Sequence, residues 1–142
     1  MKKTVSIHSL RRLSKNWRHK PQWAIATLFL SLAGYGHAQA GADATHGASV
    51  FAQECAECHS MKAGKNKKGP SLFGVVGRQG ASIADFSYSD ALKQAGLSWT
   101  PEQLDAYVAH PKKVVAGGKM KYDGLDDAAA RADLIAYLAS IH

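Results

Sequence analysis

Two cysteines and a histidine lie within five consecutive residues of this chain, and they restrict its possible folds more than any other feature. Cys55 and Cys58 are separated by two residues and followed directly by His59, and the chain contains 2 cysteines in all. A disulfide between them would close a ring of four residues and constrain little else. A zinc ion needs four protein ligands, and the sequence has no second cysteine pair or spaced histidine pair to complete them. The motif is therefore expected to serve another chemistry.

The residues before the motif help to separate the two remaining interpretations, a redox-active thiol pair and an attachment site for haem. A thioredoxin-like pair follows a strand within a βαβ frame, whereas residues 44–54 are rich in alanine and helical in character. Cys-x-x-Cys-His is typical of covalent c-type haem attachment. Positions i, i+3 and i+4 of a helical turn share one face. We therefore predict one haem c held through thioethers at Cys55 and Cys58, with His59 as an iron ligand. A thiol oxidoreductase is the alternative.

Within residues 41–142, five residues are candidates for the second axial ligand: His46, His110, His142, Met61 and Met120. Met61 follows His59 too closely to reach the opposite face of the ring. His142 ends the chain, where fraying is common. His110 precedes a proline and is expected to cap a helix end. His46 lies on the first expected helix, ahead of the attachment site.

Met120 is the best placed of the five. It lies 61 positions after His59 and follows Gly117 and Gly118, whose missing side chains let the backbone pass close to a cofactor. A thioether ligand raises the reduction potential of haem iron, and a filled coordination sphere favours electron transfer over catalysis. The rival hypothesis is an enzyme or sensor with an open iron site, such as a haem peroxidase or a gas sensor.

The hydrophobic pattern predicts an all-α fold, since no stretch alternates as a strand does. Thr100 is expected to cap a helix that starts at Pro101, with Gln103 completing a capping box. A short helix over residues 90–95 should stop at Gly96. The last helix should begin near Asp126 or Asp127, and its apolar face is formed by Leu134, Tyr137, Leu138 and Ile141.

The region from residue 61 to residue 80 is rich in glycine and lysine and is expected to form a loop. A domain of about 100 residues with long loops buries little apolar surface unaided. Buried porphyrin would supply the missing core, so we predict that the haem-free chain is largely unfolded.

Charge is distributed unevenly along the chain. Residues 1–40 hold seven basic side chains and no acidic ones, while residues 41–142 hold eleven of each sign. The formal net charge of +7 therefore belongs to the N-terminal segment, and the sequence gives little support to a nucleic-acid-binding function.

The N-terminal segment has the order of a secretory signal. Basic residues extend to Lys20, an apolar stretch follows over residues 23–33, and Ala38-Gln39-Ala40 resembles a cleavage site. A membrane anchor is the alternative, but a spanning helix needs about 20 apolar residues. We predict cleavage after Ala40 and export to the bacterial periplasm, leaving residues 41–142 as one domain. General secretion is favoured over the twin-arginine route that Arg11-Arg12 suggests.

From Gly47 to Ile141 the chain resembles class I cytochromes c of the mitochondrial-like and bacterial c2-like type. The resemblance rests on residues 55–59, 68–72, 77–78, 86–91, 111–113, 118–120 and 131–138, which occur in the family's order. It implies a small cytochrome c fold, with helices wrapped around the haem, and the role of a periplasmic one-electron carrier.

The resemblance also implies roles for individual residues. The Pro70 carbonyl would accept the ring N–H of His59. Tyr107 would lie beside Met120 and hydrogen-bond its sulfur. The haem propionates would be held by Arg78, Tyr88 and Trp99. The first helix would cross the last through Gly47 and Phe51, which would pack against Leu134 and Tyr137.

The segment around Met120 departs from the family pattern at three positions. Tyr122 replaces the usual phenylalanine, Lys121 stands where an apolar residue is common, and Ala116 replaces a frequent proline.

Lysines surround the expected haem edge, at positions 62, 65, 67, 68, 112, 113, 119 and 121. They would steer redox partners with acidic docking surfaces in a salt-sensitive encounter. Candidate partners are a bc1-type complex, a dehydrogenase, an oxidase or a photosynthetic reaction centre. The carrier is expected to be a monomer that meets membranes only through such complexes.

Overall fold

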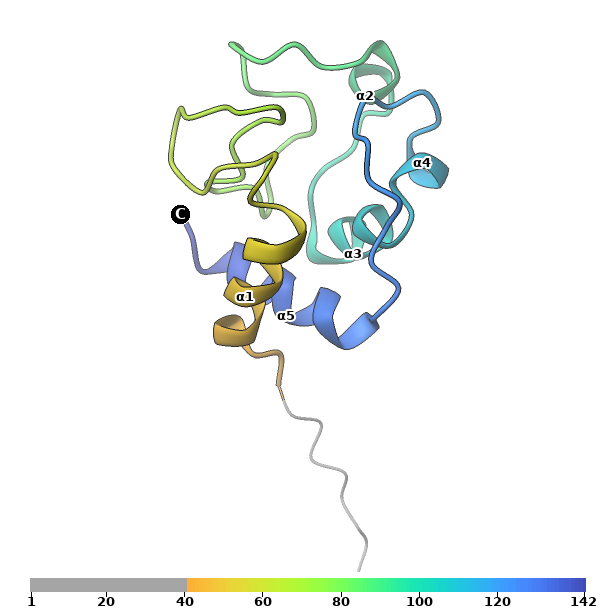
Figure 1. Ribbon diagram of the computed structural model, residues 1–142. Helices are drawn as coiled ribbons and strands as arrows, with labels where there is room; N and C mark the ends of the chain where they lie inside the picture. The colour runs from red at the N-terminus through yellow and green to blue at the C-terminus, as the bar shows by residue number, and fades with distance from the viewer. Residues whose placement is uncertain (1–40) are drawn as a thin grey trace, which may run out of the picture. The chain divides into compact units, whose positions relative to one another are not determined.

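A computed structural model describes residues 41–142, so the predicted signal sequence and its cleavage site at Ala40 lie outside the described residues. The described part contains five helices and no strand, with one isolated bridge between Gln79 and Ser98. The helices are α1 (Ala44–Glu54), α2 (Asp90–Gln94), α3 (Pro101–Ala109), α4 (Pro111–Val114) and α5 (Ala128–Ala139) (Figure 1). The all-α prediction is confirmed. Within residues 41–142, none of these helices has the length and apolar character needed to span a bilayer.

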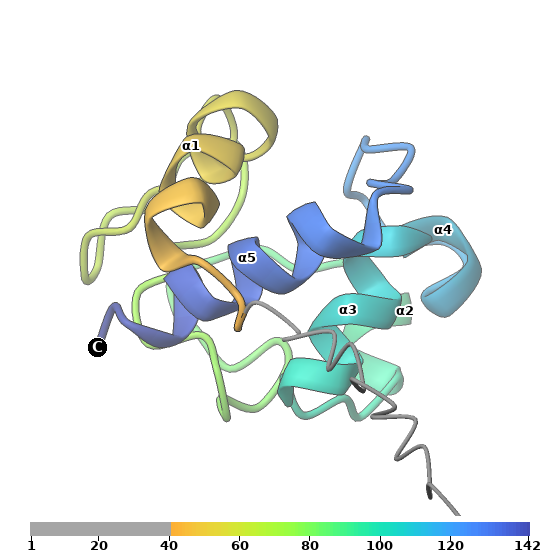
Figure 2. The same ribbon diagram turned by 90° about the horizontal axis from the view of Figure 1, so that it is seen from below.

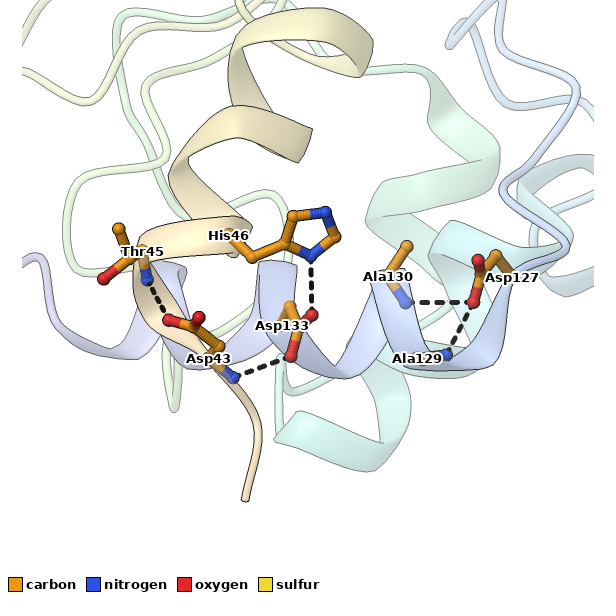
Figure 3. A network of polar contacts seen from close by, with 7 residues as sticks. All are labelled: Asp43, Thr45, His46, Asp127, Ala129, Ala130 and Asp133. Carbon is orange, nitrogen blue, oxygen red and sulfur yellow. Dashed lines mark hydrogen bonds and ion pairs between the residues drawn. The ribbon is translucent and has the colours of Figure 1, made fainter. Parts of the chain in front are cut away.

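Local side chains determine where most of these helices begin. The Asp127 carboxylate accepts the N–H groups of Ala129 and Ala130 at the start of α5, as drawn in Figure 3. At α3, the Thr100 hydroxyl accepts the Gln103 N–H at 3.2 Å. The reciprocal half of the predicted capping box is absent from this part of the chain. The N–H of Thr100 instead donates to the Ser98 carbonyl at 2.8 Å, because the preceding turn already supplies an acceptor.

The crossing of α1 and α5 forms the base of the core. Gly47 of α1 faces the backbone of Asp133, and an added Cβ would overlap the carbonyl oxygen of that residue. This close approach lets Phe51 pack against Tyr137, with ring centroids 5.7 Å apart. Leu134 is only 1% exposed. The α5 helix also packs against α3, so it lies between the first helix and the middle of the chain (Figure 2).

The segment from residue 55 to residue 89 contains no helix, as predicted for residues 61–80. In Figure 1 its first part lies on the other side of the fold from α3 and α4, and its last part runs across to α2. Backbone hydrogen bonds of 2.8 Å fold it back on the attachment motif, from the Gly69 N–H to the Cys58 carbonyl and from the Leu72 N–H to the Ser60 carbonyl. This loop therefore holds the residues after His59 close to the motif itself.

Candidate cofactor site

One cavity of about 510 Å³ brings together residues from almost every part of the described chain. Its lining includes all nine residues predicted for the site, namely Cys55, Cys58, His59, Pro70, Arg78, Tyr88, Trp99, Tyr107 and Met120. Protein cavities that enclose cofactors have volumes of this order. The fold thus collects in one place residues that are up to 65 positions apart in the sequence.

The two cysteines are free thiols, and both line the cavity. Burial, together with the charges of Glu54 and Cys58, raises the pKa of the Cys55 thiol to about 11. A thiol–disulfide oxidoreductase needs an attacking thiolate with a pKa near or below neutrality. Because Cys55 is protonated at neutral pH, the site does not suit the thiol oxidoreductase alternative.

The position of His59 fixes its tautomer. Its Nδ1 lies 2.8 Å from the Pro70 carbonyl oxygen, the contact that the resemblance implies. A carbonyl oxygen only accepts, so Nδ1 carries the proton and Nε2 keeps its lone pair. Burial lowers the pKa of His59, an effect that the hydrogen bond to Pro70 opposes and the charge of Lys67 reinforces. The neutral imidazole is the form that binds a metal.

Gly69 is required beside this ring. An added Cβ would overlap the Cε1 atom of His59, so the backbone of the loop lies directly against the imidazole ring. Since Pro70 follows directly, the same segment both confines the ring and accepts its Nδ1 proton.

The residues expected to hold propionates form a polar wall of the cavity. Arg78 donates to the carbonyl oxygens of Phe73 at 2.7 Å and Ser71 at 2.9 Å. A guanidinium has five N–H donors, so three remain after these two contacts. Tyr88 and Trp99 are each 8% exposed, and burial raises the pKa of the Tyr88 hydroxyl.

Tyr107 and Met120 line the same cavity, but within residues 41–142 no hydrogen bond joins the Tyr107 hydroxyl to the Met120 sulfur. Tyr107 packs instead against Trp99, with ring centroids 4.9 Å apart. Burial raises the pKa of the Tyr107 hydroxyl. This residue therefore contributes an aromatic surface beside the polar wall.

The other four candidates for the second axial ligand lie outside the cavity lining. His46 pairs with the Asp133 carboxylate at 2.7 Å on the outer side of the α1–α5 crossing (Figure 3). His110 occupies the cap position at the end of α3, as predicted, where its backbone N–H donates to the Ala106 carbonyl. Its side chain makes no capping hydrogen bond at the start of α4. Among the five candidates, Met120 alone shares the cavity with His59.

Sequence reasoning missed a contact at the edge of the cavity. The Tyr122 hydroxyl donates to the Glu54 carboxylate at 2.8 Å, and both residues line the cavity. The tyrosine in place of phenylalanine was a usable signal at one end of this contact. Glu54 gave none, because an exposed glutamate at the end of a helix is common.

Ion pairs neutralise some of the lysines that were predicted to surround the haem edge. Lys68 pairs with Glu57, and Lys112 pairs with Asp123 at 2.7 Å. Lys119 and Lys121 line the cavity, and no ion pair within residues 41–142 includes either of them. Unpaired positive charge at the cavity edge is therefore concentrated beside Met120.

Comparison with known proteins gives the family. A family model described as Cytochrome c matches residues 44–142. The chain belongs to the cytochrome c family. It is 47% identical over 100 residues to cytochrome c of Gibberella zeae, covering 70% of this chain and 94% of that protein.

Bacterial proteins show the same similarity. Cytochrome c2 of Rhodopila globiformis is 44% identical over 99 residues, which cover 70% of this chain and 93% of that one. Among solved structures, cytochrome cH from Methylobacterium extorquens has a TM-score of 0.65 at 43% identity, covering 69% of this chain and 98% of that chain. The cytochrome c fold predicted from the resemblance is confirmed.

Membership of the family carries covalent haem c, and the residues present fit that group. Two free thiols stand in the attachment motif, a neutral imidazole follows them, and leucine and valine side chains form much of the wall. Residues 41–142 contain no cluster of three or more His, Cys, Asp or Glu side chains that would hold a bare metal ion. Like its relatives, this cytochrome c is an electron carrier and not an enzyme.

Proposed function

We propose that this cytochrome c is an exported one-electron carrier of the bacterial periplasm, in which His59 and Met120 are the axial ligands of the haem iron. The observation that carries the proposal is the shared cavity, which holds both residues together with Cys55 and Cys58. When bound, the haem supplies an iron that takes up and releases one electron. The protein residues keep that iron in one coordination state.

The protein holds the imidazole of His59 in a fixed orientation for iron ligation. Its hydrogen bond to Pro70 fixes the ring orientation and makes Nε2 more basic. Gly69 and Pro70 belong to a loop that is itself hydrogen-bonded to Cys58, so attachment and ligation depend on one rigid segment. Rigid ligation keeps structural change on electron transfer small.

The polar wall is proposed to hold the two propionates. Arg78 has free N–H donors, and the positive charge of its guanidinium would compensate the negative charge of buried carboxylates. The Tyr88 hydroxyl and the Trp99 indole N–H add polar atoms on buried rings. These residues would lower the cost of enclosing two negative groups in a mainly apolar cavity.

Export is proposed from residues 1–40, whose basic, apolar and small-residue zones are those of a secretory signal cleaved after Ala40. The start of the family match at residue 44 supports a division into a signal sequence and one domain over residues 41–142. N-terminal sequencing of protein from a periplasmic fraction is expected to start at Gly41. A start at Met1 would contradict cleavage.

The proposed partners are redox proteins with acidic docking surfaces, such as a bc1-type complex, a dehydrogenase, an oxidase or a photosynthetic reaction centre. Lys119 and Lys121 support this, because they place positive charge where the cavity meets solvent. A single copy of the chain supplies every proposed ligand, which suits a monomeric carrier.

Carbon monoxide binding to the reduced protein tests the ligation. The wild-type protein should bind it slowly or not at all, because both axial positions are filled. Met120→Ala should bind it rapidly, while Met61→Ala is a matched control whose side chain packs against the core outside the cavity lining. Rapid binding by the wild-type protein would contradict the role of Met120.

A further inference from the structure

The hydrogen bond between Tyr122 and Glu54 crosses the edge of the cavity. Glu54 is the last residue of α1 and directly precedes Cys55, while Tyr122 lies two positions after Met120. The two residues are 68 positions apart, and their side chains meet at 2.8 Å. The contact therefore joins the attachment segment to the segment that carries Met120.

Few other contacts hold the segment from residue 116 to residue 125. Backbone hydrogen bonds of 3.0 Å fix its two ends, from the Gly118 N–H to the Val115 carbonyl and from the Leu125 N–H to the Val108 carbonyl. At the second end, the Arg131 guanidinium of α5 also donates to the Leu125 carbonyl at 2.8 Å. Between them, the Lys112–Asp123 ion pair leads back only to α4, and its two side chains are 68% and 96% exposed. Within residues 41–142, the Tyr122 hydroxyl is the one side-chain tie from this segment to the attachment site.

The position of Glu54 makes the tyrosine hydroxyl useful. A carboxylate at the C-terminal end of a helix faces the negative end of the helix dipole and is unfavourable there. No ion pair in the described part of the chain includes Glu54. The Tyr122 hydroxyl supplies a charge-assisted hydrogen bond at this point, which phenylalanine lacks.

We propose that Tyr122 is a positioning residue whose hydrogen bond to Glu54 keeps the Met120 segment closed over the cavity and slows loss of the Met120 sulfur from the iron. The inference rests on the proposed function, in which Met120 is the second axial ligand. It assigns to Glu54 and Tyr122 a shared role that neither side chain performs alone.

Ligand exchange in the oxidised, haem-loaded protein tests this role. Excess imidazole is mixed with the protein, and its replacement of Met120 is followed by visible absorption. Tyr122→Phe and Glu54→Ala should each accelerate replacement by roughly fivefold or more, since solvent weakens this charge-assisted hydrogen bond toward the net value of a neutral one. Glu54→Gln should fall between wild type and Glu54→Ala, because its amide oxygen still accepts from the hydroxyl but carries no charge. The Tyr122→Phe/Glu54→Ala double variant should match either single variant.

The control is Asp123→Asn, one residue from Tyr122. It weakens an ion pair that a side chain of the same segment makes, the one with Lys112, and should leave the exchange rate unchanged. Unfolding in urea is measured for every variant, because general destabilisation would accelerate exchange in the control as well. Acceleration confined to the Tyr122 and Glu54 variants is what a positioning role requires.

Two outcomes overturn the inference in distinguishable ways. Unchanged exchange in both single variants, or effects that multiply in the double variant, would overturn the positioning role and leave Met120 as ligand. Met120→Ala provides the reference for an open position. If the wild-type protein bound imidazole as fast as that variant, the proposed ligation and the positioning role would both be wrong.

Discussion

The backbone of α1 at Gly47 lies against the carbonyl oxygen of Asp133 in α5, with no space for a side chain between them. The same missing Cβ would lie 2.8 Å from the Cβ of Tyr137. The α1 helix leads into the attachment site, and α5 lines the base of the cavity. These two helices can therefore cross so closely only where one of them has a glycine.

Gly47→Ala is expected to destabilise the haem-loaded protein by about 1–3 kcal/mol, the usual cost of an overpacked core position. The sign of the change in stability is informative. Alanine is about 1 kcal/mol more favourable than glycine inside a helix, so the substitution would stabilise α1 if the crossing were loose. Urea unfolding measures the change. Ser49→Ala, at an exposed position of the same helix, is the control and should change stability by less than about 0.5 kcal/mol. A more stable Gly47→Ala protein would contradict the close crossing.

Asp133 also ties the start of the domain to α5. Its carboxylate accepts the Asp43 N–H at 2.7 Å and pairs with His46 (Figure 3). These two contacts, the backbone hydrogen bond first, hold the pKa of Asp133 below its ordinary value. A carboxyl group with a lowered pKa stabilises the fold above its unfolded pKa, and that contribution is lost as the pH falls through the folded value.

Replacing Asp133 by asparagine should therefore reduce stability at neutral pH and leave it nearly unchanged in acid. The difference from wild type should shrink below about pH 4, where the carboxyl group of the unfolded chain is protonated. Urea unfolding over a pH series measures this difference. Asp126→Asn is the matched control, since no ion pair in residues 41–142 includes Asp126. If the difference in stability between Asp133→Asn and wild type stayed constant down to pH 2, the ionised Asp133 carboxylate would not be the source of the stabilisation.

Features determined by neighbouring residues were predictable from the sequence. Thr100 and Asp127 mark the starts of α3 and α5 because a cap acts on N–H groups two or three positions away. The nine predicted site residues share a cavity because the attachment motif and the family order leave one arrangement around a single ring. The α4 helix was not predicted, since a helix of 4 residues is too short to show periodicity.

Contacts between distant segments were not predictable, because they depend on how helices cross. His46 meets Asp133 across 87 positions, and Tyr122 meets Glu54 across 68. Neither pair has a spacing that marks it in one sequence. The carbonyl partners of Arg78 were missed for the same reason, since they depend on the path of the loop before it.

The haem-free chain is expected to lose most of its helicity. Leu134 and Leu138 of α5 and Leu104 of α3 line the cavity, so without haem these core side chains would face a space that no apolar group fills. Far-ultraviolet circular dichroism of the Cys55→Ala/Cys58→Ala variant, purified without haem, measures the loss against the haem-loaded wild type. Full native helicity in that variant would show that the polypeptide core suffices.

Unpaired lysines beside Met120 should control reaction with charged partners. Replacing Lys119 and Lys121 by glutamine should slow oxidation of the reduced protein by anionic hexacyanoferrate(III) by roughly three- to tenfold at low salt, because electrostatic steering is lost. The same change should accelerate oxidation by a cationic cobalt(III) complex. Stopped-flow absorption measures both rates.

The control for this prediction carries the same change in charge away from the cavity. Lys62→Gln with Lys65→Gln removes two positive charges from residues outside the lining and should have the smaller effect. At about 1 M salt the Debye length falls to about 3 Å, so all variants should react alike. Visible spectra must match wild type, which excludes a change at the iron. Equal slowing with both oxidants would show that the lysines affect the fold or the ligation and not the encounter.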